Sequence, residues 1–210
     1  MIAQLPAGEF YPGDSGFSEG LAAVEELLPV LPSGPRQGFI DKTGAVVIKP
    51  QFDWVAAFTE GLAVAGVKTN GVTKYGYIDK TGAWVIKPQF STAYLFAESL
   101  AVVGTLIPGR SGDSPVDTTY SFIDKTGKVV IKLKQSQMPS GPGFSGGVAG
   151  LHTDANPGPM TYIDTTGKVI WQGPDSSSFV GDSCLRTVSP RSRAAGGTGE
   201  SLEERLCLPT

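Results

Sequence analysis

The stretch Gly76-Tyr77-Ile78-Asp79-Lys80-Thr81-Gly82-Ala83-Trp84-Val85-Ile86-Lys87-Pro88-Gln89-Phe90 decides the fold, because the chain repeats it. Residues 38–52 match it almost residue for residue, residues 121–132 match its first dozen positions, and residues 161–171 match it more loosely. Repetition of this kind indicates stacked or radially arranged copies of one small supersecondary unit. The stretch therefore predicts an array, and it does not by itself identify a ligand.

Two markers alternate along the chain and set the length of the repeat. The first is Phe-x-x-Gly/Ser-Leu/Val-Ala, which begins at Phe17, Phe58, Phe96 and Phe144. The second is the Ile-Asp-x-Thr-Gly turn, which contains Asp41, Asp79, Asp124 and Asp164. Successive copies are 41, 38 and 48 residues apart for the first marker and 38, 45 and 40 for the second. The repeat is therefore about 40 residues long.

Each repeat predicts a meander of three antiparallel strands. Asp79 and Gly82 suit a type I turn, in which the Asp side chain accepts from backbone N–H groups and Gly adopts a left-handed conformation. The residues on both sides of the turn are β-branched or aromatic, which indicates a hairpin. Pro88 is expected to end the second strand, since proline cannot donate to a ladder. The apolar run 62–67 predicts the third strand.

A lone unit of this size cannot bury both of its faces, so neighbouring units must cover it. The phenylalanines that open the first marker are the expected plugs between copies. In the first unit, Leu21, Val24 and Leu28 have helical spacing, but the register of the later copies favours a strand over Leu21 to Val24. The fourth unit keeps its turn and lacks the Lys-Pro-Gln-Phe exit, as terminal repeats often do.

The sequence predicts one β domain over residues 17–188, between a leader and a tail. The predicted segments are a leader (1–16), four units (17–52, 58–90, 96–133 and 144–171), a partial fifth unit (179–188), and a linker with a short C-terminal helix (189–210). The helix rests on a capping-box pattern of Ser201 with Glu204, and a frayed tail is the alternative.

Composition excludes several classes of function. A net charge of −3 gives no electrostatic reason for a nucleic-acid partner. Cys184 and Cys207 have no metal-ligand spacing, and whether they form a disulfide stays open. The first residues lack a signal-peptide pattern, and no apolar run is long enough to span a membrane, so a cytoplasmic location is expected.

These repeats resemble the WG (KWG) repeat family of bacterial proteins. The family unit reads roughly Trp-Gly-Tyr/Phe-Ile-Asp-x-x-Gly, a β run, Pro-x-Phe/Tyr and then Phe-x-x-Gly-Leu-Ala, and residues 75–101 fit it, as do residues 38–63. The resemblance covers residues 17–171. The namesake Trp is replaced in the four copies by Gln37, Tyr75, Tyr120 and Met160, and the third and fourth copies also lose the Gly. The resemblance implies a β-repeat module for binding or accessory roles, with no catalytic residues to carry over.

Two motifs suggest catalysis when they are taken alone. Asp-Lys-Thr-Gly at Asp41, Asp79 and Asp124 matches the phosphorylated aspartate of P-type ion pumps, but the further Thr of that motif is Ala45, Ala83 or Lys128 here. Gly-x-Ser-x-Gly occurs around Ser18 and Ser145, which would require His152, the only histidine, as base. Threonine and alanine occupy the equivalent positions in the other copies. The favoured interpretation is that the Asp-Lys-Thr-Gly motif forms a turn and that the Gly-x-Ser-x-Gly motif leads into a strand.

Other side chains suggest binding. Lys49, Lys87 and Lys132 occupy equivalent positions after the Val/Ile run, where they form either an anion-binding rim or solvated strand ends. The three tryptophans share no repeat position, so packing is favoured over a ligand platform for Trp54, Trp84 and Trp171.

The sequence thus predicts an all-β array that forms a propeller-like ring or an open curved β-solenoid. We expect a non-catalytic binding or scaffold module that recognises a protein, or a glycan, through loops such as residues 107–117, with no metal or cofactor. The alternatives are a serine hydrolase using Ser18 or Ser145, and a structural spacer without a ligand.

Overall fold

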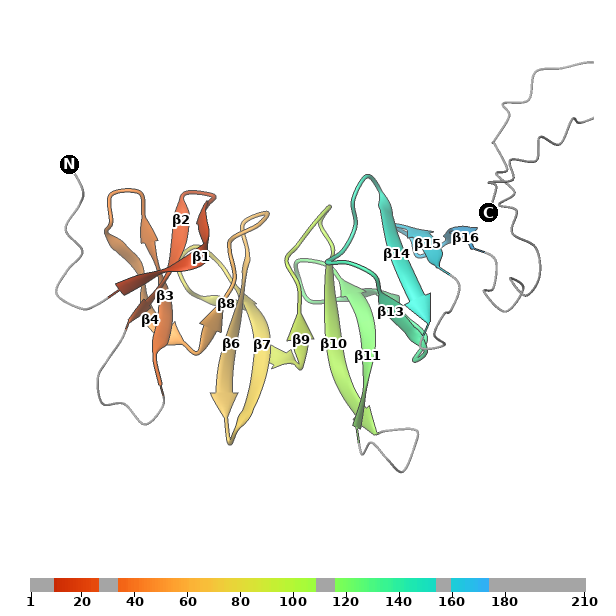
Figure 1. Cartoon of the computed structure of the whole chain (residues 1–210), viewed down its shortest axis with the longest axis horizontal. Helices are drawn as coiled ribbons and strands as arrows, with labels where there is room; N and C mark the ends of the chain where they lie inside the picture. The colour runs from red at the N-terminus through yellow and green to blue at the C-terminus, as the bar shows by residue number, and fades with distance from the viewer. Residues whose placement is uncertain (1–9, 27–33, 109–115, 154–159, 174–210) are drawn as a thin grey trace, which may run out of the picture. The chain divides into compact units, whose positions relative to one another are not determined.

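The computed structural model describes residues 10–26, 34–108, 116–153 and 160–173, and the regular elements in these ranges are all β-strands (Figure 1). The chain divides after Gly173, and every described residue lies in the first unit, Met1–Gly173. Residues 27–33, the partial fifth repeat, the C-terminal helix and both cysteines lie outside the described residues. No helix in the described part is long and apolar enough to cross a membrane.

The strands form four antiparallel sheets, each built from four strands in chain order. Sheet 1 contains β1 (Phe10–Ser18), β2 (Leu21–Glu26), β3 (Arg36–Asp41) and β4 (Val46–Phe52). Sheet 2 contains β5 (Trp54–Val55), β6 (Ala63–Thr69), β7 (Val72–Ile78) and β8 (Trp84–Phe90). Sheet 3 contains β9 (Thr92–Ala93), β10 (Ala101–Pro108), β11 (Val116–Ile123) and β12 (Val129–Lys132). Sheet 4 contains β13 (Gln137–Pro139), β14 (Val148–Thr153), β15 (Thr161–Asp164) and β16 (Val169–Gln172).

The prediction of three strands per unit is wrong, because every sheet has a fourth strand, which precedes the Phe marker in sheets 2 to 4 and contains Phe17 in sheet 1. In sheet 2 this strand is only Trp54–Val55, which pairs with Gly66 and Ala65 of β6. It forms because the chain, on leaving the outer strand β4, runs back beside β6 before it reaches Phe58. In sheet 1 the corresponding strand is longer and begins at Phe10, within the predicted leader.

Pro88 does not end its strand, contrary to the prediction. β8 continues through Pro88 to Phe90, because a bulge accommodates the proline. Tyr77 pairs with Ile86 and Tyr75 pairs with Phe90, so β8 has two more residues than β7 over this interval. Since β8 is an edge strand and Pro88 lies in the bulge, its missing N–H breaks no ladder hydrogen bond.

The glycine opposite this bulge has a steric reason in the two copies that contain it. A Cβ on Gly76 would run into the carbonyl oxygen of Ile86 and lie 2.8 Å from the nitrogen of Pro88. A Cβ on Gly38 would meet the backbone of Ile48 and Pro50 in the same way. The third and fourth copies lack the proline and have Ser121 and Thr161 at the glycine position. Glycine is therefore needed where the proline bulge brings the two backbones together.

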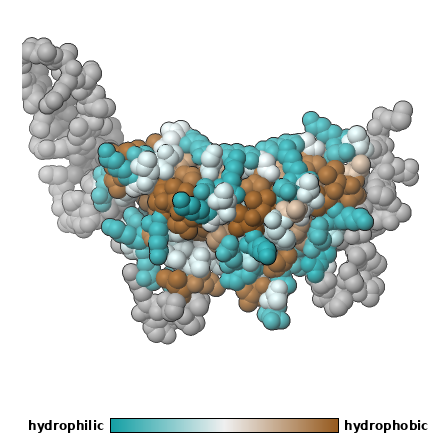
Figure 2. All heavy atoms as spheres, turned by 180° about the vertical axis from the view of Figure 1, so that it is seen from behind, coloured by the Kyte–Doolittle hydropathy of each residue, from teal (hydrophilic) through white to brown (hydrophobic). Residues whose placement is uncertain are grey.

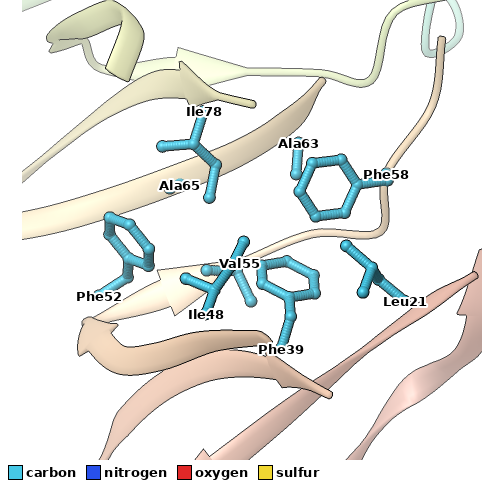
Figure 3. Close-up of a cluster of buried hydrophobic side chains, with 9 residues drawn as sticks. All are labelled: Leu21, Phe39, Ile48, Phe52, Val55, Phe58, Ala63, Ala65 and Ile78. Carbon is cyan, nitrogen blue, oxygen red and sulfur yellow. The ribbon is translucent and has the colours of Figure 1, made fainter. Parts of the chain in front are cut away.

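Three hydrophobic cores hold the array together, and each lies between two successive sheets. Figure 3 shows the first core, in which Phe58 of the second repeat lies among residues of sheets 1 and 2. Its ring centroid is 4.8 Å from that of Phe39. Phe96 meets Tyr77, and Phe144 meets Phe122, at the same distance. The predicted role of these three phenylalanines as plugs is confirmed.

The first unit resolves the conflict between helix and strand. Leu21–Glu26 forms β2, and Leu21 packs in the first core while Val24 is buried. The register of the later copies therefore outweighs the local helical spacing.

Candidate interaction surface

The four Asp-x-Thr-Gly turns have the same hydrogen bonds. In the second copy, Asp79 Oδ1 accepts from the Thr81 amide at 2.8 Å, from the Thr81 hydroxyl, and from the Ala83 amide at 3.1 Å. Gly82 donates to the Asp79 carbonyl at 3.0 Å and has a φ of 83°. The Asp carboxylates thus close turns, as predicted, including Asp164 of the fourth copy, which Thr165 follows in place of Lys.

The same contacts make the turns sensitive to acid. The Thr81 hydroxyl, aided by the amides of Thr81 and Ala83, holds the pKa of Asp79 below its ordinary value. The pKa values of the three equivalent aspartates are lowered by their own threonines. Because the folded-state pKa is depressed, each turn stabilises the fold above the ordinary Asp pKa and loses that contribution as the pH falls through the folded-state value.

We expect Asp79→Asn to weaken the pH dependence of stability. The Asn amide oxygen still accepts the turn's hydrogen bonds but has no proton to take up. The free energy of unfolding, measured by urea titration between about pH 6 and about pH 3, should fall less for the variant than for the wild type. Equal falls for the two proteins would contradict the assigned role of Asp79.

A second recurring contact joins each sheet to the next through a glutamate. The Glu60 carboxylate accepts from the amide of Ser99 at 3.0 Å and pairs with Lys125 Nζ at 3.1 Å. Lys125 also donates to the Glu60 carbonyl at 2.9 Å. Burial raises the pKa of Glu60, but these contacts outweigh it and lower the pKa overall. The lysine comes from the next repeat's Asp-Lys-Thr-Gly turn, so this turn also serves as half of a joint between sheets.

The other copies show how the joint varies. Glu19 reaches Gly61 and Lys80, whereas Glu98 reaches only Gly147, because Thr165 replaces the lysine in the fourth turn. The three glutamates have φ values of 50°, 52° and 53°, a left-handed conformation that is uncommon outside glycine. The fourth copy has Gly146 there, with a φ of 62°. The Phe marker does not specify the residue at this position. The presence of glutamate in three of the four copies is nevertheless a signal from which the joint could be predicted.

The structure separates the residues of the hydrolase hypothesis. Ser18 ends β1 in sheet 1, and its hydroxyl donates to the Phe58 carbonyl at 2.6 Å. Ser145 precedes β14 in a turn, where its amide donates to the Val148 carbonyl. His152 is on β14 and pairs with Met138 of β13. Among the contacts of the described residues, neither serine is hydrogen-bonded to His152.

The three tryptophans have different surroundings. Trp84 packs against the first core, with its ring edge-on to Phe52. Trp54 and Trp171 are exposed on the surface, so the preference for packing is wrong for these two residues. Trp54 lies edge-on to Tyr75, and Trp171 lies beside Tyr162, with ring centroids 5.7 Å apart.

The outermost strands of sheets 1 to 3 carry a repeated pair of exposed side chains, a valine and the lysine two residues later. We call these six residues the outer-strand row: Val47, Lys49, Val85, Lys87, Val130 and Lys132. The valines are 44–47% exposed. Residues two apart on a strand point to the same side, so each pair presents one apolar and one cationic group together.

The three lysines of the outer-strand row form no ion pair with any residue that the structure describes, in contrast to Lys80 and Lys125. Figure 2 shows hydrophobic and hydrophilic patches side by side on the face of the molecule opposite to that seen in Figure 1. Because equivalent residues of each sheet pack on the next sheet, the row recurs at the same place in three successive repeats. The surface offers repeated positive charge beside apolar groups.

The described ranges contain no cluster of three or more His, Cys, Asp or Glu side chains that could hold a metal ion. Within the loop over residues 107–117, the expected recognition element, residues 109–115 lie outside the described residues.

Comparison with known families identifies the repeat. A family model described as WG containing repeat matches residues 38–72, 75–104 and 120–134. The matches confirm the resemblance drawn from the repeated motifs, and they include the turns of the first three copies. A search of curated proteins finds no match.

Proposed function

We propose that this chain, which contains matches to the WG containing repeat, is a non-catalytic binding module that holds an acidic protein segment along its outer-strand row. The observation that carries the proposal is the recurrence, in three successive sheets, of an exposed valine beside an exposed lysine that has no ion pair with the described residues. The turn aspartates, and the turn lysines Lys80 and Lys125, already have partners within the chain.

The chemistry of the row favours a peptide with alternating acidic and apolar side chains. Carboxylates would pair with the lysines, while apolar groups would cover the valines. Each exposed ion pair contributes only about 0.2–1 kcal/mol, so one pair alone gives little affinity. Three equivalent sites on one scaffold add their contributions when a single ligand reaches all of them.

An alternative role of these lysines is protection of the strand edges. Lysine on an edge strand discourages pairing with another chain, and a spacer without a ligand needs nothing more. The two roles differ in one measurable respect, because a protective lysine creates no affinity for acidic peptides.

The test uses a fluorescein-labelled dodecapeptide of alternating glutamate and valine as the probe. We expect the wild-type full chain to bind it, and Lys49→Gln/Lys87→Gln/Lys132→Gln to bind it about tenfold more weakly or worse. The control is Lys42→Gln/Lys68→Gln/Lys128→Gln, which removes the same charge from exposed lysines outside the row and should change affinity less than about twofold.

Three outcomes would overturn the proposal. The first is the absence of binding by the wild type, which favours the spacer. The second is equal loss in both triple variants, which indicates attraction by net charge alone. The third is equal binding of single-stranded DNA, which indicates a general polyanion surface. Binding of a glycan through exposed Trp54 would instead be lost in Trp54→Ala and kept in the row variant.

The hydrolase alternative has its own test, which is labelling by a fluorophosphonate probe. We expect no labelling, because the Ser18 hydroxyl is hydrogen-bonded to a backbone carbonyl and Ser145 has no hydrogen bond to His152 among those of the described residues. Labelling that is lost in Ser145→Ala or Ser18→Ala would favour an enzyme.

We also propose that the array is an open β-solenoid instead of a closed ring. Ring closure would bury the face of sheet 1 that points away from sheet 2 against the face of sheet 4 that points away from sheet 3. Phe17 and Trp171 belong to these two faces, and they are 50% and 52% exposed. Small-angle X-ray scattering of the full chain, compared with profiles calculated for both forms, would distinguish them.

A further inference from the structure

We propose that Asn70, at the tip of the β6–β7 hairpin, is a site of spontaneous deamidation and that its isoaspartyl product opens this tip. Asparagine occurs in the chain at positions 70 and 156. Gly71 follows Asn70 and has a backbone N–H, whereas Pro157 follows Asn156 and has none. The reaction uses that N–H group, so it selects Asn70. The site is independent of the outer-strand row, which lies on β4, β8 and β12.

The two reacting residues form the turn between β6 and β7. Asn70 and Gly71 have φ values of 51° and 80°, and Thr69 pairs with Val72 on either side of them. Positive φ at both central positions defines the type I′ turn, for which Asn-Gly is a preferred sequence. The turn thus places an asparagine directly before the residue whose backbone nitrogen no side chain shields.

The reacting atoms are open to solvent in the part of the chain that the structure describes. Residues 68–72 are all exposed, and a Cβ added to Gly71 would meet no heavy atom within 4 Å apart from its chain neighbours. Among the hydrogen bonds of the described residues, none uses the Asn70 side chain or the Gly71 amide. Because Thr69 and Val72 form the last pair of the ladder, the tip opens without disturbing a core.

The modification consumes water and releases ammonia. Hydroxide takes the proton of the Gly71 amide, and this nitrogen attacks Cγ of Asn70. A bond from the nitrogen to Cγ forms, the bond from Cγ to Nδ2 breaks, and the side-chain nitrogen leaves as ammonia with a proton from water. Water then opens the cyclic imide at one of its two carbonyl carbons. Opening at Cγ gives aspartate, whereas opening at the backbone carbonyl carbon gives isoaspartate, in which the chain runs through Cβ and Cγ.

The isoaspartyl product does not fit this turn. It adds a methylene group to the backbone between Thr69 and Gly71, and a two-residue turn cannot accommodate the group without displacing the Thr69–Val72 pair. Ala63 and Ile78 pair at the other end of the hairpin and lie in the first core, so they are unaffected. Modification therefore loosens the tip of one hairpin and leaves the array folded.

The first experiment incubates the native full chain at about pH 8 and at about pH 6 and locates deamidation by mass spectrometry of its peptides. We expect the peptide with Asn70 to gain the mass difference between an acid and its amide. The rate should be at least about tenfold higher at the higher pH, because the attacking nitrogen must lose its proton. Asn156 is the internal control and should stay unchanged.

Protein L-isoaspartyl methyltransferase serves as the probe for the product. We expect it to methylate the incubated chain, because ring opening forms isoaspartate and direct hydrolysis of the side chain does not. Deamidation without methylation would overturn the proposed route. Deamidation that occurs in urea and not in the native chain would also overturn the inference, since the folded turn would then protect Asn70.

The second experiment measures hydrogen exchange of the modified chain after its separation by ion exchange. We expect faster exchange at Thr69 and Val72 and unchanged exchange at Ala63. The matched control is Asn70→Asp, which adds the same charge without the methylene group and suits the same turn, so it should exchange like the wild type. Equal acceleration in Asn70→Asp, or unchanged exchange in the modified chain, would contradict the opening of the tip by the longer backbone.

Discussion

Replacing Phe58 with alanine is expected to lower the free energy of unfolding by about 3–5 kcal/mol, the range for a buried phenylalanine. Phe58 is fully buried and joins two sheets, with its ring against Phe39. No side chain in the first core can fill the resulting cavity without leaving its own position between the sheets. Urea denaturation of the full chain, followed by tryptophan fluorescence, measures the loss.

Phe17→Ala is the matched control, because it makes the same chemical change at the same position of the marker. Phe17 is 50% exposed, and it makes no contribution to the three described cores. Its removal should lower the free energy of unfolding by less than about 1 kcal/mol. Similar losses in the two variants would show that the marker phenylalanine acts within its own repeat and does not plug the junction.

Replacing Gly76 with alanine should lower the free energy of unfolding by about 3 kcal/mol, because the added methyl group meets backbone atoms. The new Cβ would lie 2.8 Å from the Pro88 nitrogen and against the Ile86 carbonyl. Neither atom can move alone, since both belong to the bulge that carries β8 past the proline. The clash is therefore relieved only by separating β7 from β8.

Ser121→Ala is the control for this variant. Ser121 occupies the glycine position of the third copy, where β11 and β12 pair without the proline bulge. A Cβ is already accommodated there, so the free energy of unfolding should change by less than about 0.5 kcal/mol. A small effect of Gly76→Ala would contradict the steric explanation of this glycine.

Much of the fold could be predicted from the sequence because the repeats supply independent copies of each signal. Residue chemistry alone predicts the turn at Asp79 and Gly82, and three other copies fix its boundaries. The register of the markers also favours, correctly, a strand at Leu21–Glu26 over the helix that the local spacing of that segment indicates.

The fold prediction is wrong where a strand is too short to show a periodic pattern, or where its end depends on a residue elsewhere in the chain. Trp54–Val55 has no detectable alternation, so the fourth strand of each sheet was missed. The local sequence predicts a strand end at Pro88, because the bulge that carries β8 past the proline depends on Gly76, twelve residues earlier in the chain. The occurrence of Gly with Pro in two copies, and of neither in the other two, contained that information.

The candidate surface was only partly predictable. The equivalence of Lys49, Lys87 and Lys132 is visible in the sequence, but whether each lysine is paired depends on contacts between sheets. Glu60, for example, pairs with Lys125, 65 residues later in the chain, and no sequence pattern shows that this lysine, and not an outer-strand lysine, is the paired one. The exposure of Trp171 could not be predicted either, since it depends on which side chains pack on the far face of sheet 4.

The most direct test of the proposed function is a hydrogen-exchange footprint of the full chain with and without the glutamate–valine peptide. We predict slower exchange on binding in the outer strands β4, β8 and β12, with no change at the Trp54–Tyr75 pair or at the ends of β10 and β11. Slower exchange only at the ends of β10 and β11, or only at Trp54 and Tyr75, would contradict a binding site on the outer-strand row.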